Sequence, residues 1–170
     1  MNMRFTVYRS ADEIAAACRQ ALELEPTTQS YELPPPEMAN WHSIELAAWP
    51  LGESIRLSIK GNQDLYQNRV IYSPIMEVVE CLQLGRGRQS FVMALGFIRA
   101  APLAARLAKF LNDPEINGHV IYSLLEMRSG GFVSTVQTLV HADAAWTGKL
   151  AKRYLRKYAS LGKGPSPSGH

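Results

Sequence analysis

Four basic side chains near the end of the chain are spaced so that a helix would gather them on one face. They stand at positions i, i+3, i+4 and i+7, and they are Lys149, Lys152, Arg153 and Arg156. Such a face could bind an acidic patch on a protein or the phosphates of a nucleic acid. It could also be the solvated face of a terminal helix, whose cations suit the negative end of the helix dipole. The sequence leaves these interpretations open, and it favours an acidic protein over a nucleic acid.

A second basic segment has the sequence Gly85-Arg86-Gly87-Arg88. Its backbone amides could cradle an anion. It lacks the Lys-Ser/Thr ending of a P-loop, so we interpret it as a turn between helices. Arg86, Arg88 and Arg99 could still line the edge of a concave binding surface.

Aromatic side chains form a third candidate site. Trp41 and Trp49 flank a predicted β-hairpin and follow a proline-rich stretch. If these rings are exposed, they would mark a partner-binding surface. If they are buried, they would instead cap the domain.

Catalytic and metal-binding motifs are missing from the sequence. The histidines His42, His119, His141 and His170 show no metal-ligand spacing, and no G-x-S-x-G nucleophile motif is present. We therefore expect no catalytic residues, no metal and no cofactor.

Charge and composition restrict the class of protein further. No Asp or Glu follows Asp143, whereas six of the 18 basic residues do, so the C-terminal end is strongly basic and the rest mildly acidic. No apolar run reaches the ~20 residues that span a bilayer. Cys18 and Cys81 fit reduced thiols. We therefore expect a cytoplasmic protein without a membrane segment.

The N-terminal part is predicted to mix strands and one helix. Alternating apolar residues predict a strand over Met3–Tyr8, and Ser10 and Glu13 form a capping-box pattern before a helix over Ala11–Glu25. After the irregular stretch 26–40, the same alternation predicts a hairpin over 41–60, with Pro50-Leu51-Gly52 as its turn.

From Ser73 onward the apolar pattern is helical and recurs. Positions i, i+4, i+7 and i+8 are apolar in one set and again 29 residues later, namely Leu103, Leu107, Phe110 and Leu111, then Phe132, Val136, Leu139 and Val140. A helical period inside a period of about 30 indicates stacked helical pairs. The expected helices cover 73–84, 89–99, 102–112, 115–128, 132–141 and 144–160.

Short motifs in the central repeat carry a family likeness. Ala94-Leu95-Gly96-Phe97-Ile98 is followed by Pro102-Leu103 and then by Asp113-Pro114. Over roughly residues 73–160, this run resembles HEAT-like repeats of the short kind found in phycobilisome lyases. The outer repeats depart from the pattern, because Ala144 stands where a proline would follow Asp143 and Gly118-His119 replaces the usual Val-Arg pair.

These observations together predict a mixed, mainly α fold. A small N-terminal α+β cap, a β-hairpin plus a helix, would occupy residues 1–72, three HEAT-like helical pairs would form an α-solenoid over 73–160, and 161–170 would be a flexible tail. Such arrays present a surface, so we expect a non-catalytic protein-binding module that uses the concave surface of the solenoid, in a bacterial cytoplasm, as an adaptor, an assembly factor or a toxin-neutralising immunity protein. The resemblance also implies two alternatives, a bilin-attaching enzyme and a nucleic-acid-binding protein.

Overall fold

The protein is all α over the residues that the structure describes. The computed structural model describes residues 5–26, 38, 40–98 and 100–159, and none of these residues is in a β-strand. The predicted α+β cap with its hairpin is therefore wrong. The expected tail at 161–170 lies outside the described residues.

A single long helix, α2 (Ser43–Gly61), replaces the predicted hairpin. The apolar residues alternate over a few positions, but across the whole segment the buried ones, Ile44, Ala48, Ile55 and Ile59, follow a helical period. Pro50 lies inside this helix and does not form a turn. The chain tolerates it even though a proline removes one backbone hydrogen bond from a helix.

The predicted N-terminal strand is an extended segment that lies along α2. Met3 and Arg4 are outside the described residues. The amides of Thr6 and Tyr8 donate to the hydroxyls of Ser54 and Ser58, over 3.1 and 2.8 Å. Alternate amides thus face a helix instead of a neighbouring strand, and the alternating pattern correctly indicated extended backbone but not a sheet.

The expected helices are present, several of them shorter than predicted. Short 3-10 turns often complete them, and the expected helix 132–141 stops at Gln137 and continues as turns. Besides α2, the elements are α1 (Ala11–Leu22), α3 (Gln63–Gln67), η2 (Arg69–Ile71), α4 (Tyr72–Glu80), η3 (Leu82–Arg88), α5 (Gln89–Leu95), α6 (Ala101–Ala108), η4 (Lys109–Asn112), α7 (Asn117–Glu126), α8 (Val133–Gln137) and α9 (Ala145–Tyr158).

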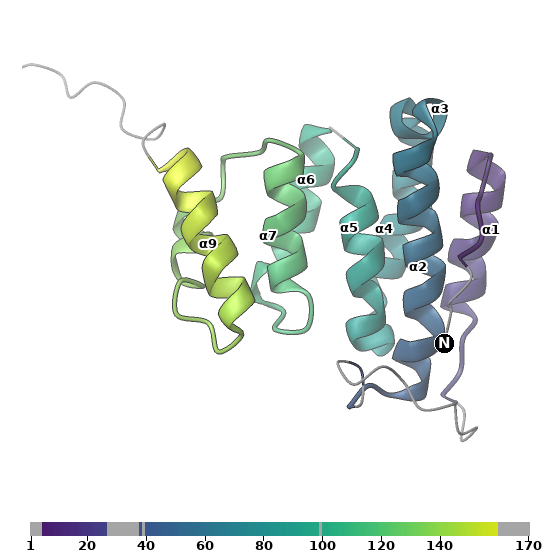
Figure 1. Cartoon of the computed structure of the whole chain (residues 1–170), viewed down its shortest axis with the longest axis horizontal. Helices are drawn as coiled ribbons and strands as arrows, with labels where there is room; N and C mark the ends of the chain where they lie inside the picture. Colours follow the sequence, from purple (N-terminus) through teal and green to yellow (C-terminus); the bar gives the residue numbers. More distant parts are fainter. Residues whose placement is uncertain (1–4, 27–37, 39, 99, 160–170) are drawn as a thin grey trace, which may run out of the picture.

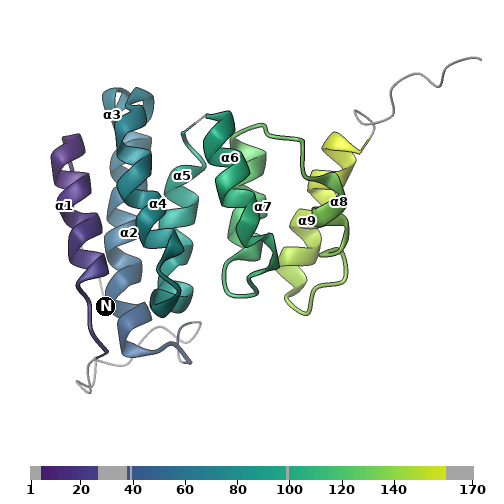
Figure 2. The same ribbon diagram turned by 180° about the vertical axis from the view of Figure 1, so that it is seen from behind.

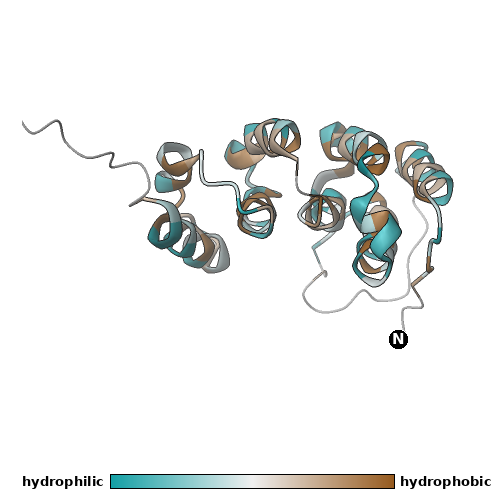
Figure 3. Cartoon of the chain, turned by 90° about the horizontal axis from the view of Figure 1, so that it is seen from above, coloured by the Kyte–Doolittle hydropathy of each residue, from teal (hydrophilic) through white to brown (hydrophobic). Residues whose placement is uncertain are grey.

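The main helices form two rows that run the length of the molecule (Figures 1 and 2). An outer row holds α1, α4, α6 and α8, and an inner row holds α2, α5, α7 and α9. Seen from above, α5 and α7 are set back relative to α2 and α9, so the inner row is the slightly concave side (Figure 3). In the inner row each helix packs on the next. This arrangement of successive helical pairs is compatible with a helical-repeat solenoid.

A glycine on one helix faces a serine or threonine on the next at each junction of the inner row. The three facing pairs are Gly52 with Ser90, Gly96 with Ser123, and Gly118 with Thr147. Hydroxyls of the same residues cross the junctions: Ser90 donates to the Trp49 carbonyl over 2.8 Å, Ser123 to the Val92 carbonyl over 2.7 Å, and Thr147 to Asn117 Oδ1 over 3.4 Å. The missing side chain lets the helices approach closely.

Replacement of Gly52 by alanine tests this close packing. A β-carbon there would collide with Ser90 Oγ and lie 2.5 Å from Phe91 Cδ2, with both partners buried. We expect Gly52→Ala to lower the free energy of unfolding by about 1–3 kcal/mol, because overpacking forces side chains and backbone to shift. Urea denaturation followed by circular dichroism measures the change.

Gly61→Ala is the matched control, since it lies in the same helix and its β-carbon would meet nothing within 4 Å. We expect Gly61→Ala to be neutral or to stabilise by up to about 1 kcal/mol. Equal effects of the two substitutions would show that helix propensity, and not the junction, determines the response.

Candidate functional site

The C-terminal helix α9 is fixed to the end of the array by its buried face. Leu150, Ala151, Tyr154 and Tyr158 are buried, and α9 packs on α7 and α8. The Tyr154 hydroxyl donates to the Ser129 carbonyl over 2.6 Å and accepts from an amide of the same loop. Burial raises the pKa of Tyr154 to about 12, so the hydroxyl keeps its proton. The buried face therefore determines which side chains of α9 point outward.

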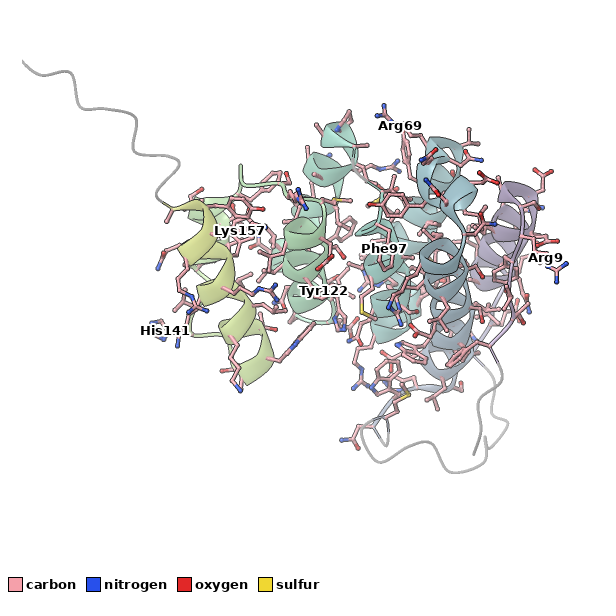
Figure 4. The ribbon with its side chains drawn as sticks, turned by 45° about the horizontal axis from the view of Figure 1, so that its top comes forward. Arg9, Arg69, Phe97, Tyr122, His141 and Lys157 are labelled. Atoms are coloured by element: carbon pink, nitrogen blue, oxygen red, sulfur yellow. The ribbon has the colours of Figure 1, made fainter. Side chains whose placement is uncertain are left out.

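The predicted cationic face is present on α9 at one end of the molecule, where Figure 4 labels Lys157 and His141. The four predicted cations, Lys149, Lys152, Arg153 and Arg156, are all exposed. Lys157 on the same helix is also exposed. Helix α9 contains no acidic residue. The ion pairs of the described residues include none of these cations, so their charges are available to an external anion.

A groove of about 830 Å³ runs beside these cations, between α9 and the segment that begins with α8. Four of its lining residues are the cations, and apolar side chains line the rest, namely Val140, Trp146, Leu150 and Leu155, with Gln137 beside them. Trp146 stands at helical spacing from Leu150 and Tyr154, which predicts that all three point inward, but Trp146 is 44% exposed. The sequence pattern did not show that this aromatic side chain belongs to the same surface as the cations.

Trp146 rests on the start of α7. Its ring centroid lies 4.7 Å from that of His119, and Gly118 leaves room for the indole, since a β-carbon there would lie 2.6 Å from Trp146 Cζ3. Burial lowers the pKa of His119 to about 4, so this imidazole is neutral near pH 7. The tryptophan therefore borders a groove whose positive charge comes from α9.

Arg86 and Trp41 lie together, but an internal carboxylate holds the arginine. Glu45, only 2% exposed, accepts from the Arg86 amide over 2.8 Å, from Arg86 Nη2 over 3.0 Å and from the His42 amide over 2.8 Å. The Arg86 guanidinium also donates to the Asn40 carbonyl and stacks 5.3 Å from the centroid of the Trp41 ring. The Gly-Arg turn does bind an anion, as its composition suggested, but that anion is Glu45.

Arg88 lies in the interior of the molecule. It is 1% exposed, and it donates to the Gly85 carbonyl over 2.8 Å and to Asp113 over 2.8 Å, with Glu115 at 3.3 Å. Asp113 belongs to the Asp-Pro turn of the following repeat. Arg88 therefore joins two repeats, and we leave it out of the surface proposed below.

The other candidates that the structure describes lie apart from the α9 groove. Trp49 is half-buried in α2, where its ring centroid lies 6.2 Å from that of Phe5. The residues that line the groove do not include Trp41, Trp49, Arg86 or Arg88. The structure thus gathers the C-terminal cations into one site and separates them from these four. The last candidate, Arg99, lies outside the described residues.

Metal and membrane features are also missing from the described part of the chain. No group of three or more His, Cys, Asp or Glu side chains there could hold a metal ion, and no helix there is long and apolar enough to cross a membrane. Cys18 is buried, and burial raises the pKa of its thiol to about 12, so it is not a thiolate nucleophile near pH 7.

Comparisons with protein-family models, with curated proteins and with solved structures found no match to this chain. The structure itself shows a protein of many helices, and this arrangement is compatible with a helical-repeat solenoid. The HEAT-like assignment depends on the motifs of the central repeat.

The Glu45–Arg86 pair should make the free energy of unfolding depend on pH. Burial by itself would raise the pKa of Glu45, but the hydrogen bonds from Arg86 and the His42 amide, with the Arg86 charge, together hold the pKa below its ordinary value. A depressed folded-state pKa stabilises the protein above the ordinary carboxyl pKa, and this stabilisation is lost as pH falls through the folded-state value. Glu45→Gln should cost about 1.5–3 kcal/mol near neutral pH.

The measurement is urea unfolding of both proteins at several pH values from neutral to acid. The difference between Glu45→Gln and the unsubstituted protein should shrink as the pH falls. Glu25→Gln, which changes an exposed carboxylate with no hydrogen bond or ion pair to the described residues, serves as a control. A difference that stays constant with pH would contradict the assigned role of the Glu45 charge.

Proposed function

We propose that this protein is a non-catalytic protein-binding module, built from short HEAT-like repeats, that binds its partner through α9. The observation that carries the proposal is the set of exposed α9 cations, unpaired within the described residues, on the rim of an apolar groove. Cations bordered by apolar surface suit a protein with an acidic patch, because the charges steer association while apolar contacts supply affinity.

The HEAT-like assignment is supported by the central repeat. Asp113, from the Asp-Pro turn, both pairs with Arg88 and accepts from the Glu115 amide over 3.0 Å. The motif that carries the resemblance therefore has a structural role here, as the turn that ends the first helix of a pair and leads into the second.

The biological form that we propose is a bacterial, cytoplasmic adaptor, assembly factor or immunity protein. The expected concave surface is a second place for contact, but the groove with unpaired charge lies at the end of the array. A bilin-attaching activity is less well supported, since an open groove rimmed by cations offers no enclosed apolar site and no cysteine lines it. A nucleic-acid partner would use the same cations but would leave the apolar surface uncovered.

Charge reversal on α9 tests the proposal. Lys152→Glu, Arg153→Glu and Arg156→Glu together should abolish capture of the partner from a lysate of the source organism, because the new carboxylates repel an acidic surface. The three side chains are exposed, so we expect the unfolding midpoint to change little. Quantitative mass spectrometry of affinity-purified samples measures the capture.

The matched control reverses three exposed cations elsewhere, Lys60, Arg69 and Lys109, and changes the net charge equally. Figure 4 labels Arg69 well away from α9. The control should retain the partner. Equal loss in both variants would indicate a general charge effect, and retention in both would remove α9 from the interface.

A further inference from the structure

The last helical pair differs from the one before it in its outer helix. Helix α9 has 14 residues, whereas α8 has five and continues as turns as far as His141. In the preceding pair, α6 and η4 together extend from Ala101 to Asn112 beside the ten residues of α7. The groove lies where these less regular turns run beside α9.

Apolar side chains line both sides of the groove. Trp146 lies in the first turn of α9 and Leu155 in its last, Leu150 lies between them but is buried, and Val140 contributes from the turns that follow α8. Trp146 is 44% exposed and rests against His119, so its position is fixed while one side of the ring stays free. A fixed, half-exposed tryptophan at the edge of a groove is a typical anchor of a protein interface.

The cations follow the same axis. The first and last of the set, Lys149 and Arg156, are seven residues apart, which is about two helical turns or roughly 10 Å. Carboxylates at positions i, i+3 or i+4, and i+7 of a partner helix would span the same distance of roughly 10 Å. The positive charge thus matches a second helix laid along α9, with acidic residues beside its apolar stripe.

We propose that the groove binds an amphipathic α-helix of a partner protein, with its apolar stripe on Trp146 and Val140 and its flanking Asp and Glu side chains on the cations. The bound helix would extend the helical stack. This inference rests on the proposed protein-binding function and names the chemistry of the partner. Recognition of a helix in a groove uses the apolar groove and the charges together. Binding of a nucleic-acid phosphate backbone would need only the charges.

A defined peptide tests the inference without knowledge of the natural partner. The probe is a fluorescein-labelled peptide of about 18 residues, enough for about five helical turns, with leucines at i, i+3, i+4 and i+7 and glutamates beside them. Fluorescence anisotropy with the full chain should give a dissociation constant below about 100 μM. A peptide of the same composition in scrambled order should bind at least tenfold more weakly.

Two variants separate the contributions of the groove. Trp146→Ala should weaken binding of the ordered peptide at least tenfold, and so should Lys152→Glu with Arg153→Glu, which changes only exposed side chains. Lys60→Glu with Lys109→Glu, the matched control, should change it less than threefold. Circular dichroism of the bound peptide, after subtraction of the protein spectrum, should show an increase in helix.

Three results would overturn the inference. The first is no binding of the ordered peptide up to about 1 mM. The second is salt-dependent binding of a duplex oligonucleotide to α9 that Trp146→Ala leaves unchanged. The third is self-association that Trp146→Ala abolishes, which would identify a second copy as the occupant. If α9 charge reversal still removes the cellular partner in the lysate experiment, the protein-binding function would stand while the helix inference fails.

Discussion

The close approach of consecutive helices in the inner row is the constraint on which the rest of the structure depends. At each junction a glycine faces a hydroxyl-bearing residue, and the hydroxyls of Ser90, Ser123 and Thr147 bond to an oxygen of the preceding helix. The glycine allows the helices to come close, and the oxygen of the preceding helix gives the buried hydroxyl an acceptor that it would otherwise lack. Because the same solution recurs from α2 to α9, the row stays continuous and ends in a helix with a free cationic face.

Two arginines join successive helical pairs where the loops meet. Arg86 joins the turn before α5 to Glu45 at the start of α2, and Arg88 joins that turn to Asp113 and Glu115 in the next repeat. A buried charge without its partner is strongly unfavourable, so such pairs specify one register more than they add net stability. The Gly-Arg turn thus connects three successive helical pairs, and this explains why a basic, glycine-rich segment lies away from the open surface.

Sequence patterns predicted the C-terminal half better than the N-terminal half, for a physical reason. Leu150 and Tyr154 repeat at a helical period over a long segment, and α9 was found close to its predicted limits. Ile44, Leu46 and Ala48 alternate with a period of two, although Ile44 and Ala48 are also four residues apart, as on one face of a helix, and Pro50 with Gly52 looked like a turn. Whether this segment forms a hairpin or a helix depends on α5, whose Ser90 and Phe91 pack against Gly52 from about 40 residues away. No local pattern contains that contact.

The stepwise packing of the array has a consequence for its dynamics. Helix α9 packs on α7 and α8 at the end of the row, and the hydrogen bonds of Tyr154 to the loop between those helices are among its few polar ties. In an array held by nearest-neighbour contacts, the terminal unit can open while the interior remains folded. Amide hydrogen exchange is therefore expected to be fastest in α8 and α9 and slowest around α5. Binding of a partner to α9 would then slow amide exchange throughout this terminal unit, well beyond the residues in direct contact.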